Sequence, residues 1–319
     1  MSKRRQSAPL PAFVSRLPAP LRFAVEIVAR TADDFLEDGA PRLAAALAYY
    51  LLIALAPLLI VAVAVAGAFF ARQEVRDSIL GMAYNLFGDA GAVVVNQILI
   101  GIMRSNTSSA TAATLLGVAV ALFGASAAFG QLQAAINIVW GIRPRPEDFR
   151  HMLRRRGLAF LMVLIIGVLL VGALIFGTGL ARVLGALLPS ISGIGWLTEK
   201  AISFVGAAVL FAIIFTVLPD RRVDWRDTIV GAAVTSLLFN AGSVALGAYL
   251  GRSSIGSLYG AAGSIAVVLV WLYYTTQVLL FGAEFTHVWA ARRRAARIER
   301  AEREEAAGRP QSEESSAEE

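Results

Sequence analysis

Long uninterrupted apolar stretches dominate the chain, and charged residues are largely confined to the segments between them. A helix needs about 20 apolar residues to cross about 30 Å of hydrocarbon. Because the runs are continuous rather than alternating, they favour helices over a transmembrane barrel. The predicted fold class is therefore all-α, a polytopic membrane protein with a six-transmembrane-helix bundle. The predicted spans are about 43–70, 111–139, 157–180, 201–218, 228–250 and 265–289.

Two further segments have amphipathic periodicity without the length of a span. From Arg22 to Leu36, apolar residues recur at helical spacing, which predicts an N-terminal interfacial helix leading into the first span. Residues 71–110 repeat the pattern on both sides of a break at Gly88–Gly91, but they carry too much charge for a seventh span. We expect two external amphipathic helices there.

The ends of the chain differ from the membrane domain at 21–290. Residues 1–20 are basic and rich in proline, which predicts a disordered arm, and no cleavable signal peptide is expected. Residues 291–319 predict a charged helical extension of the last span followed by a disordered acidic tail. The glycine-rich loop at 251–264 fits either a tight turn or a re-entrant segment.

The distribution of charge predicts an orientation. The mean hydropathy is +0.66, and most of the 29 lysines and arginines lie in the two termini and in the loops at 140–156 and 219–227. The positive-inside rule then places both termini in the cytoplasm. These arginine clusters are expected to contact anionic headgroups of membrane lipids, and nucleic acid is not an expected partner. The sequence does not decide the oligomeric state, and a homo-oligomer is one possibility.

Candidate catalytic chemistry is sparse. The chain has no cysteine, and its two histidines, His151 and His287, are far apart in the sequence. No metalloprotease, serine-hydrolase or phosphate-loop motif is present in the sequence. We therefore expect no enzyme activity, no metal site and no cofactor.

Polar side chains within the predicted spans fall on narrow helix faces, at 100° per residue. Such groups are more often packing contacts between helices than a transport site. An intramembrane acid, by contrast, is a functional candidate by default, although Glu284 could also pair with Arg292, Arg293 or the arginines in 143–156. Pro57 is expected to kink the first span and act as a hinge. The predicted substrate-binding residues are Glu284, Gln277, Tyr273, Asn137, Gln133 and Tyr50.

Three stretches resemble the YihY/BrkB family of bacterial inner-membrane proteins: LAAALAYYLLIALAPLLI (43–60), LQAAINIVWGI (132–142) and IGSLYGAAGSIAVVLVWLYYTTQVLLFGAEF (255–285). The first stretch departs from the family at Ala54-Leu55-Ala56, where members often have a serine. The resemblance implies a six-helix cytoplasmic-membrane protein with both ends inside. It implies no defined activity, because members have been labelled ribonuclease BN, virulence factor or serum-resistance protein.

Two functional hypotheses follow. The first is a transporter or flippase of a lipid-like or amphiphilic solute, in which Glu284 is a proton-linked or cation-binding group. The alternative is a non-catalytic envelope-assembly or virulence/serum-resistance scaffold, in which the polar stripes only hold the helices together. A ribonuclease is disfavoured, because the metal ligands and nucleophile that it would need are absent from the sequence.

Overall fold

The structure is a computed structural model of the chain, and it describes residues 18–67, 71–104, 127–142, 157, 161, 194–221, 223–252 and 260–308. Every regular element in these ranges is an α-helix. An unlabelled helix, Ala127–Val139, lies between α3 and α6 in the sequence. The labelled helices are α1 (Ala19–Glu37), α2 (Ala40–Ala66), α3 (Arg72–Arg104), α6 (Ile194–Val217), α7 (Trp225–Arg252) and α9 (Gly260–Gly308).

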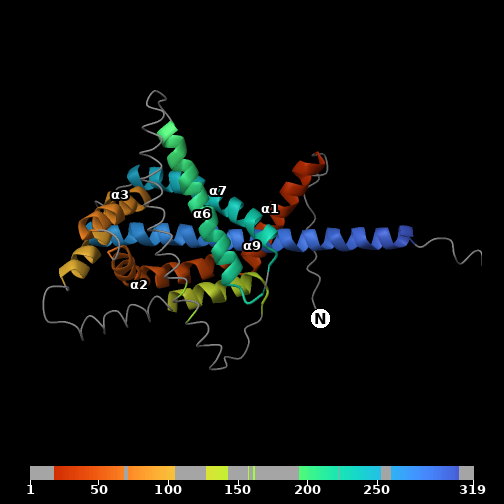
Figure 1. Cartoon of the computed structure of the whole chain (residues 1–319), viewed down its shortest axis with the longest axis horizontal. Coiled ribbons are helices and arrows are strands. Elements are labelled where there is room, and N and C mark those ends of the chain that lie inside the picture. Colours follow the sequence, from red (N-terminus) through yellow and green to blue (C-terminus); the bar gives the residue numbers. More distant parts are fainter. Residues whose placement is uncertain are drawn as a thin grey trace, which may run out of the picture.

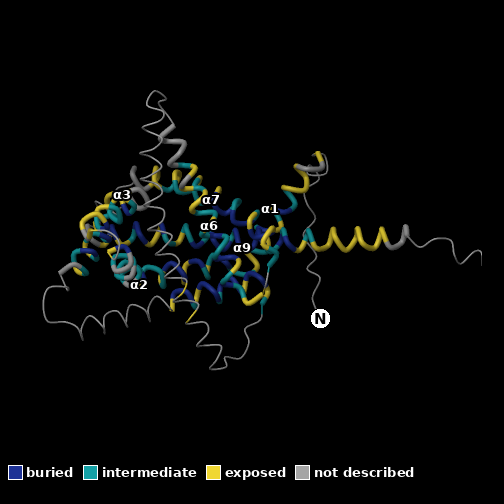
Figure 2. The backbone as a smooth tube through the Cα atoms, in the orientation of Figure 1, coloured by how far each residue is buried: buried dark blue, intermediate teal, exposed yellow. Residues whose placement is uncertain are grey.

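Helix α9 is the central helix of the structure (Figure 1). It has 49 residues, and it contacts α1, α2, α3 and α7, while α6 packs mainly on α7. The part of α9 beyond Ala290 extends past the other helices and is mostly exposed (Figure 2). This exposed part is rich in arginine and glutamate, which accounts for its position in solvent rather than in the core.

The largest apolar core lies where α2, α6, α9 and the 127–139 helix meet. Its fully buried side chains include Ile136, Phe215 and Leu280, which come from three of these helices. A smaller cluster joins Ile27 of α1 to Phe285 and Val288 of α9. The apolar face of α1 is therefore packed against the same helix that receives α2.

Gly39 forms the corner between α1 and α2, which are bent by 67° from one another. Its φ of 66° lies in the left-handed region that glycine adopts without steric cost. The Gly39 N–H donates to the carbonyl of Leu36 at 3.1 Å, closing the last turn of α1. Helix α1 is thus turned sharply away from α2, and its place at the membrane interface stays a prediction.

Helix α3 doubles back on itself. In a straight helix, residues 76 and 96 would be about 30 Å apart. Instead, the Arg76 guanidinium donates to the Asn96 carboxamide at 3.0 Å, and Ala83 belongs to the same buried cluster as Leu99. The backbone is assigned as one continuous helix, whereas the sequence predicted two helices separated at Gly88–Gly91. Its two arms nevertheless lie side by side.

Helices α7 and α9 are locked by a reciprocal pair of glycines and threonines. A Cβ atom on Gly231 of α7 would overlap Thr286 of α9, and one on Gly282 of α9 would overlap Thr235 of α7. Each threonine hydroxyl donates to the carbonyl of the glycine four residues earlier in its own helix, at 2.7 Å. Two Gly-xxx-Thr segments therefore face each other, and their small residues let the antiparallel backbones approach closely.

Two helices in the described ranges are long and apolar enough to cross a membrane, Trp225–Tyr249 and Ala262–Glu304. A bent pair, Leu21–Glu37 with Ala40–Ala56, would make a third span. Helix α6 overlaps the predicted span at 201–218, but its apolar segment, Ser203–Val217, is shorter. All of 157–180 except residues 157 and 161, and residues 111–126, lie outside the described residues. The six-span count stays a prediction.

The outer parts of the predicted domain division lie largely outside the described residues. This applies to residues 1–17 of the basic arm, to 309–319 of the acidic tail and to 253–259 of the glycine-rich loop. The charged stretch after Trp289 is helical and continues α9 to Gly308.

Candidate functional site

The 127–139 helix ends in a local motif that sets up the candidate site. Gly141 has a φ of 64°, and its N–H donates to the Ile138 carbonyl at 2.9 Å. The Ile142 N–H donates to the Asn137 carbonyl at 2.8 Å. These two bonds are the Schellman pattern, with glycine at the left-handed position that ends the helix. The sequence NIVWGI therefore stops the helix with Asn137 and Trp140 in its last turn.

Asn137 and Gln133 both bind the segment that follows α6. The Asn137 amide donates to the Asp220 carboxylate at 2.8 Å, and the Asp220 N–H donates back to the Asn137 oxygen at 3.1 Å. The Gln133 amide lies 2.9 Å from the Leu218 carbonyl and 3.2 Å from the Asp220 carboxylate. Both amides are buried, so these bonds satisfy groups that would otherwise destabilise the core.

Trp140 connects the same helix end to α9. Its indole N–H donates to the Ala283 carbonyl at 2.9 Å, and its ring stacks on His287 with centroids 6.4 Å apart. The carbonyl of Ala283 is an acceptor within an α-helix, so the indole adds a second donor to it. The end of the 127–139 helix is therefore fixed at Trp140 to the middle of α9.

Glu284 is among the most deeply buried side chains of the described residues, with 1% of its surface exposed. The residues next to it on α9 contact other helices. Gly282 packs on α7, the Ala283 carbonyl binds Trp140, and Phe285 packs on Ile27 of α1. The predicted acid therefore faces protein rather than the surface of the bundle.

The other predicted site residues lie at different depths. Tyr273 is 36% exposed and Gln277 is half-buried, although both share a face of α9 with Glu284. Tyr50 is half-buried and lies edge-on to Tyr49, with ring centroids 6.0 Å apart. Pro57 lies within α2, and its side chain is outside the described set. The structure thus brings Asn137 and Gln133 together on Asp220.

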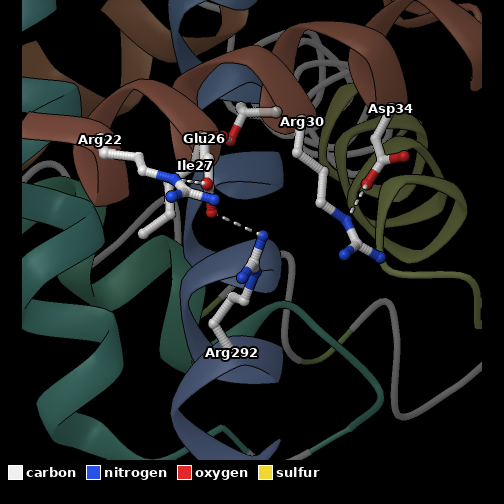
Figure 3. A network of polar contacts seen from close by, with 7 residues as sticks. Arg22, Glu26, Ile27, Arg30, Asp34 and Arg292 are labelled. Carbon is white, nitrogen blue, oxygen red and sulfur yellow. Dashed lines mark hydrogen bonds and ion pairs between the residues drawn. The ribbon is translucent and has the colours of Figure 1, made fainter. Parts of the chain in front are cut away.

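The arginine run of α9 reaches several elements. Arg293 lies 2.6 Å from the Asp227 carboxylate at the start of α7, and Arg297 lies 3.8 Å from Asp224. Arg292 lies 3.5 Å from Glu26 of α1, which also accepts from Arg22 at 2.9 Å (Figure 3). Successive arginines on a helix point about 100° apart, which lets neighbours in sequence reach different helices. Arg292 and Arg293 thus contact Glu26 and Asp227, and residues 143–156 lie outside the described ranges.

A cavity of about 40 Å³ lies beside this run. Within the residues that the structure describes, no group of three or more His, Cys, Asp or Glu is placed to hold a metal ion. The cavity lining is cationic and aromatic instead. It consists of Trp140, Arg221, Val223, His287, Ala290, Ala291 and Arg294.

Sequence reasoning did not single out Asp220 or Asp227. Both lie in or beside the short connection between α6 and α7, where acids are ordinarily solvated and carry no periodic signal. The available clue was position, because Asp220 directly follows Pro219 at the end of an apolar helix. Only the three-dimensional structure shows that an amide 83 residues earlier binds it.

Long apolar helices packed around a central helix, with polar groups turned inward, define an all-α membrane protein. The sequence model of the family described as "Virulence factor BrkB" matches residues 31–307, and the chain belongs to this family.

The chain is also similar to several proteins named UPF0761 membrane protein. It is 31% identical to one from Rhodospirillum centenum over 85% of this chain and 59% of the relative. A relative from Alkalilimnicola ehrlichii is 27% identical over 86% and 62%, and one from Aeromonas salmonicida is 26% identical over 79% and 84%. The chain thus spans about three fifths of the first two relatives. No solved structure matches the chain.

Proposed function

We propose that this protein is a multi-pass bacterial inner-membrane protein that transports or flips an amphiphilic, lipid-like solute, with both termini in the cytoplasm. The observation that carries the proposal is the burial of Glu284 within an apolar bundle. An ionisable group in such a place costs free energy unless it is used or compensated, so it is a functional candidate by default.

The polar face of α9 supports a route to this acid. Tyr273, Gln277 and Glu284 span 11 residues, which is about 16 Å of helix. Along that distance the side chains pass from exposed, through half-buried, to fully buried. The polar headgroup of an amphiphile would follow this stripe while its apolar part stays in contact with lipid. Glu284 would bind the headgroup cation or exchange a proton as the solute passes.

Reconstituted protein tests this role. Liposomes carrying the full chain and a fluorescent short-chain phospholipid report movement between leaflets through quenching by an external reductant. We expect Glu284→Gln to abolish the protein-dependent rate, and Glu284→Asp to retain part of it. Glu299→Gln is the matched control, because Glu299 is an exposed acid further along α9. An unchanged rate in Glu284→Gln would remove the proposed role.

A scaffold function is the second candidate, and a different observation favours it. Asn137 and Gln133, which the sequence placed on the solute path, hold the connection after α6 through Leu218 and Asp220. Amides used in this way stabilise an architecture and leave little hydrogen-bonding capacity for a solute. If this reading is right, wild-type protein will show no lipid movement in the liposome assay. Both candidates are non-enzymatic, and neither involves nucleic acid.

A further inference from the structure

The cavity beside the arginine run combines positive charge with a rigid aromatic wall. Arg221 comes from the connection after α6, and Arg294 comes from α9, so two separate segments contribute cations to one hollow. His287 and Trp140 form the wall, and their stacked rings are fixed by the indole bond to the Ala283 carbonyl. The side chains of Val223, Ala290 and Ala291 complete the lining without charge.

The charges around the cavity are unbalanced. Among the residues that the structure describes, the charged groups that act on the His287 imidazole are Asp34, Arg221, Arg294 and Arg30, three cations and one anion. Asp34 itself lies 3.9 Å from Arg30. Asp220, the acid next to Arg221, is turned toward Asn137 and Gln133 and does not line the cavity. An anion would therefore enter a site whose acids already have cationic or amide partners.

The residues around the cavity are of the kinds that gather at a membrane–water interface. Tryptophans gather at membrane–water interfaces, and arginines gather just beyond them on the cytoplasmic side. Trp140 lines the cavity, Trp289 lies two residues after His287, and the exposed Trp225 carries Arg226 over its ring at 5.6 Å. The arginine run begins three residues after Trp289.

The size and chemistry of the cavity fit part of a phosphate group, with the rest of the group outside it. One water needs about 10–15 Å³ of such space, so the cavity admits about three oxygen-sized atoms. Guanidinium groups match phosphate oxygens with paired N–H donors, and basic pockets on the cytoplasmic side of membrane helices bind phospholipid headgroups. We propose that Arg221, Arg294 and His287 form a binding site for the phosphate of an anionic phospholipid headgroup. This site does not depend on transport, since a scaffold could bind a headgroup equally well.

The test uses the full-length protein in nanodiscs of phosphatidylcholine with and without phosphatidylglycerol. Native mass spectrometry then counts the anionic lipids that stay bound after the protein is released from the disc. We expect Arg221→Gln/Arg294→Gln to reduce retention about tenfold or more, from the contribution of each arginine near a headgroup. Arg300→Gln/Arg303→Gln removes the same charge from the exposed part of α9 and should change retention less than about twofold.

A second variant tests the site without removing charge, in case Arg221→Gln/Arg294→Gln does not fold. Ala291 is exposed and lines the cavity, so Ala291→Phe should fill the site while leaving both arginines and the core intact. We expect it to lower lipid retention as the double variant does, with an unchanged melting temperature in detergent. Equal losses in the Arg221/Arg294 and Arg300/Arg303 pairs would overturn the site, because they would show unspecific attraction. Full retention in Ala291→Phe would overturn it as well.

A competition experiment distinguishes a lipid headgroup from free inorganic phosphate as the ligand of this site. Inorganic phosphate, compared with sodium chloride at equal ionic strength, is titrated against the wild-type protein in phosphatidylcholine nanodiscs. For a headgroup site, stabilisation against heat should follow phosphatidylglycerol, and phosphate should give a smaller shift that Arg221→Gln/Arg294→Gln removes. Stabilisation by inorganic phosphate alone, with no effect of phosphatidylglycerol, would overturn the assignment to a lipid.

Discussion

Asn137 and Asp220 hold each other in both directions. The Asn137 amide donates to the Asp220 carboxylate, while the Asp220 backbone N–H donates to the Asn137 oxygen. Asn137 belongs to the last turn of the 127–139 helix, and Asp220 belongs to the connection between α6 and α7. The pair therefore fixes the end of one helix to the exit of another, beside the cavity formed by Arg221 and Trp140.

Replacing Asn137 with leucine should destabilise the protein. The change leaves the Asp220 N–H without this acceptor and removes a charge-assisted bond. Hydrogen bonds to charged groups contribute about 1.5–3 kcal/mol in water-soluble proteins, whereas bonds between membrane helices average about 0.6 kcal/mol. We expect a loss of about 1–2 kcal/mol in the free energy of unfolding, measured by denaturant titration in mixed micelles.

Gln131→Leu is the control for this change. Gln131 lies on the same helix but is exposed, whereas Asn137 and Gln133 are buried. The control should alter the free energy of unfolding by no more than about 0.5 kcal/mol. Equal effects of Asn137→Leu and Gln131→Leu would show that the Asp220 bonds add nothing to stability.

Two glycine-to-alanine changes, one inside the α7–α9 contact and one outside it, should have opposite effects on stability. In Gly282→Ala, the new methyl group would overlap Thr235 across the α7–α9 contact. Such overpacking costs about 1–3 kcal/mol. Gly206 of α6 is exposed and has open space at its Cβ position, so Gly206→Ala should stabilise its helix by about 0.5–1 kcal/mol. Melting temperatures in detergent would report the two signs.

A double variant isolates the contact. Thr235→Gly removes the side chain that the methyl group at residue 282 would meet, so Gly282→Ala/Thr235→Gly should be more stable than the sum of the single changes predicts. Neighbouring residues in contact commonly couple by about 0.5–3 kcal/mol. Strict additivity would mean that α7 and α9 do not approach each other at this point.

The two ion pairs between α9 and the start of α7 differ in how deeply they are buried. The Asp227 side chain is 5% exposed in its pair with Arg293, whereas the Asp224–Arg297 pair is 35% and 60% exposed. Removing one partner of a buried pair costs about 3–5 kcal/mol, and exposed pairs contribute about 0–1 kcal/mol. Because Arg293 is itself partly exposed, we expect Arg293→Met to cost about 2–3 kcal/mol, and Arg297→Met less than about 1 kcal/mol.

The matched variant for this pair is Asp227→Asn/Arg293→Met, which removes both charges. It should recover part of the stability that Arg293→Met loses, because no carboxylate is left without its cation. Denaturant titrations of the wild type, Asp227→Asn, Arg293→Met and the double variant in one detergent give the coupling directly. A double variant as unstable as Arg293→Met would contradict the assignment.

Much of the helical organisation could be predicted from the sequence, because it depends on local signals. The apolar runs predicted the positions of α2, α7 and the membrane part of α9. The predicted break at Gly88–Gly91 lies between Ala83 and Val95, which share one buried cluster, but the backbone stays helical there. The burial of Glu284 also followed from the sequence, since an acid in an apolar run must face protein.

The tertiary contacts could not be predicted in this way. Tyr273 shares the face of Glu284, yet it is 36% exposed, although Trp271 and Thr276 close to it on α9 are buried. The roles of Asn137 and Gln133 depend on Asp220, which has no pattern of its own. Helical periodicity gives the angle of a side chain around its helix, but it does not identify the neighbour that covers it.

Gly141 allows a test of the motif that ends the 127–139 helix. Its φ is 64°, and a Cβ atom there would meet nothing within 4 Å. The cost of Gly141→Ala is therefore conformational alone, about 1–2 kcal/mol for an L-residue in the left-handed region. Gly141→Asn should cost less, because asparagine tolerates this conformation better than alanine does. Gly130→Ala, at an open position inside the same helix, should be neutral or stabilising.

Gly141→Ala should also weaken the contact between Asn137 and Asp220. If the Schellman turn sets the position of Asn137, strain at Gly141 should weaken the bonds of that residue to Asp220. Gly141→Ala and Asn137→Leu would then be less than additive in the free energy of unfolding. Full additivity, with Gly141→Ala still destabilising, would mean that the helix end and the Asp220 pair are held independently of one another.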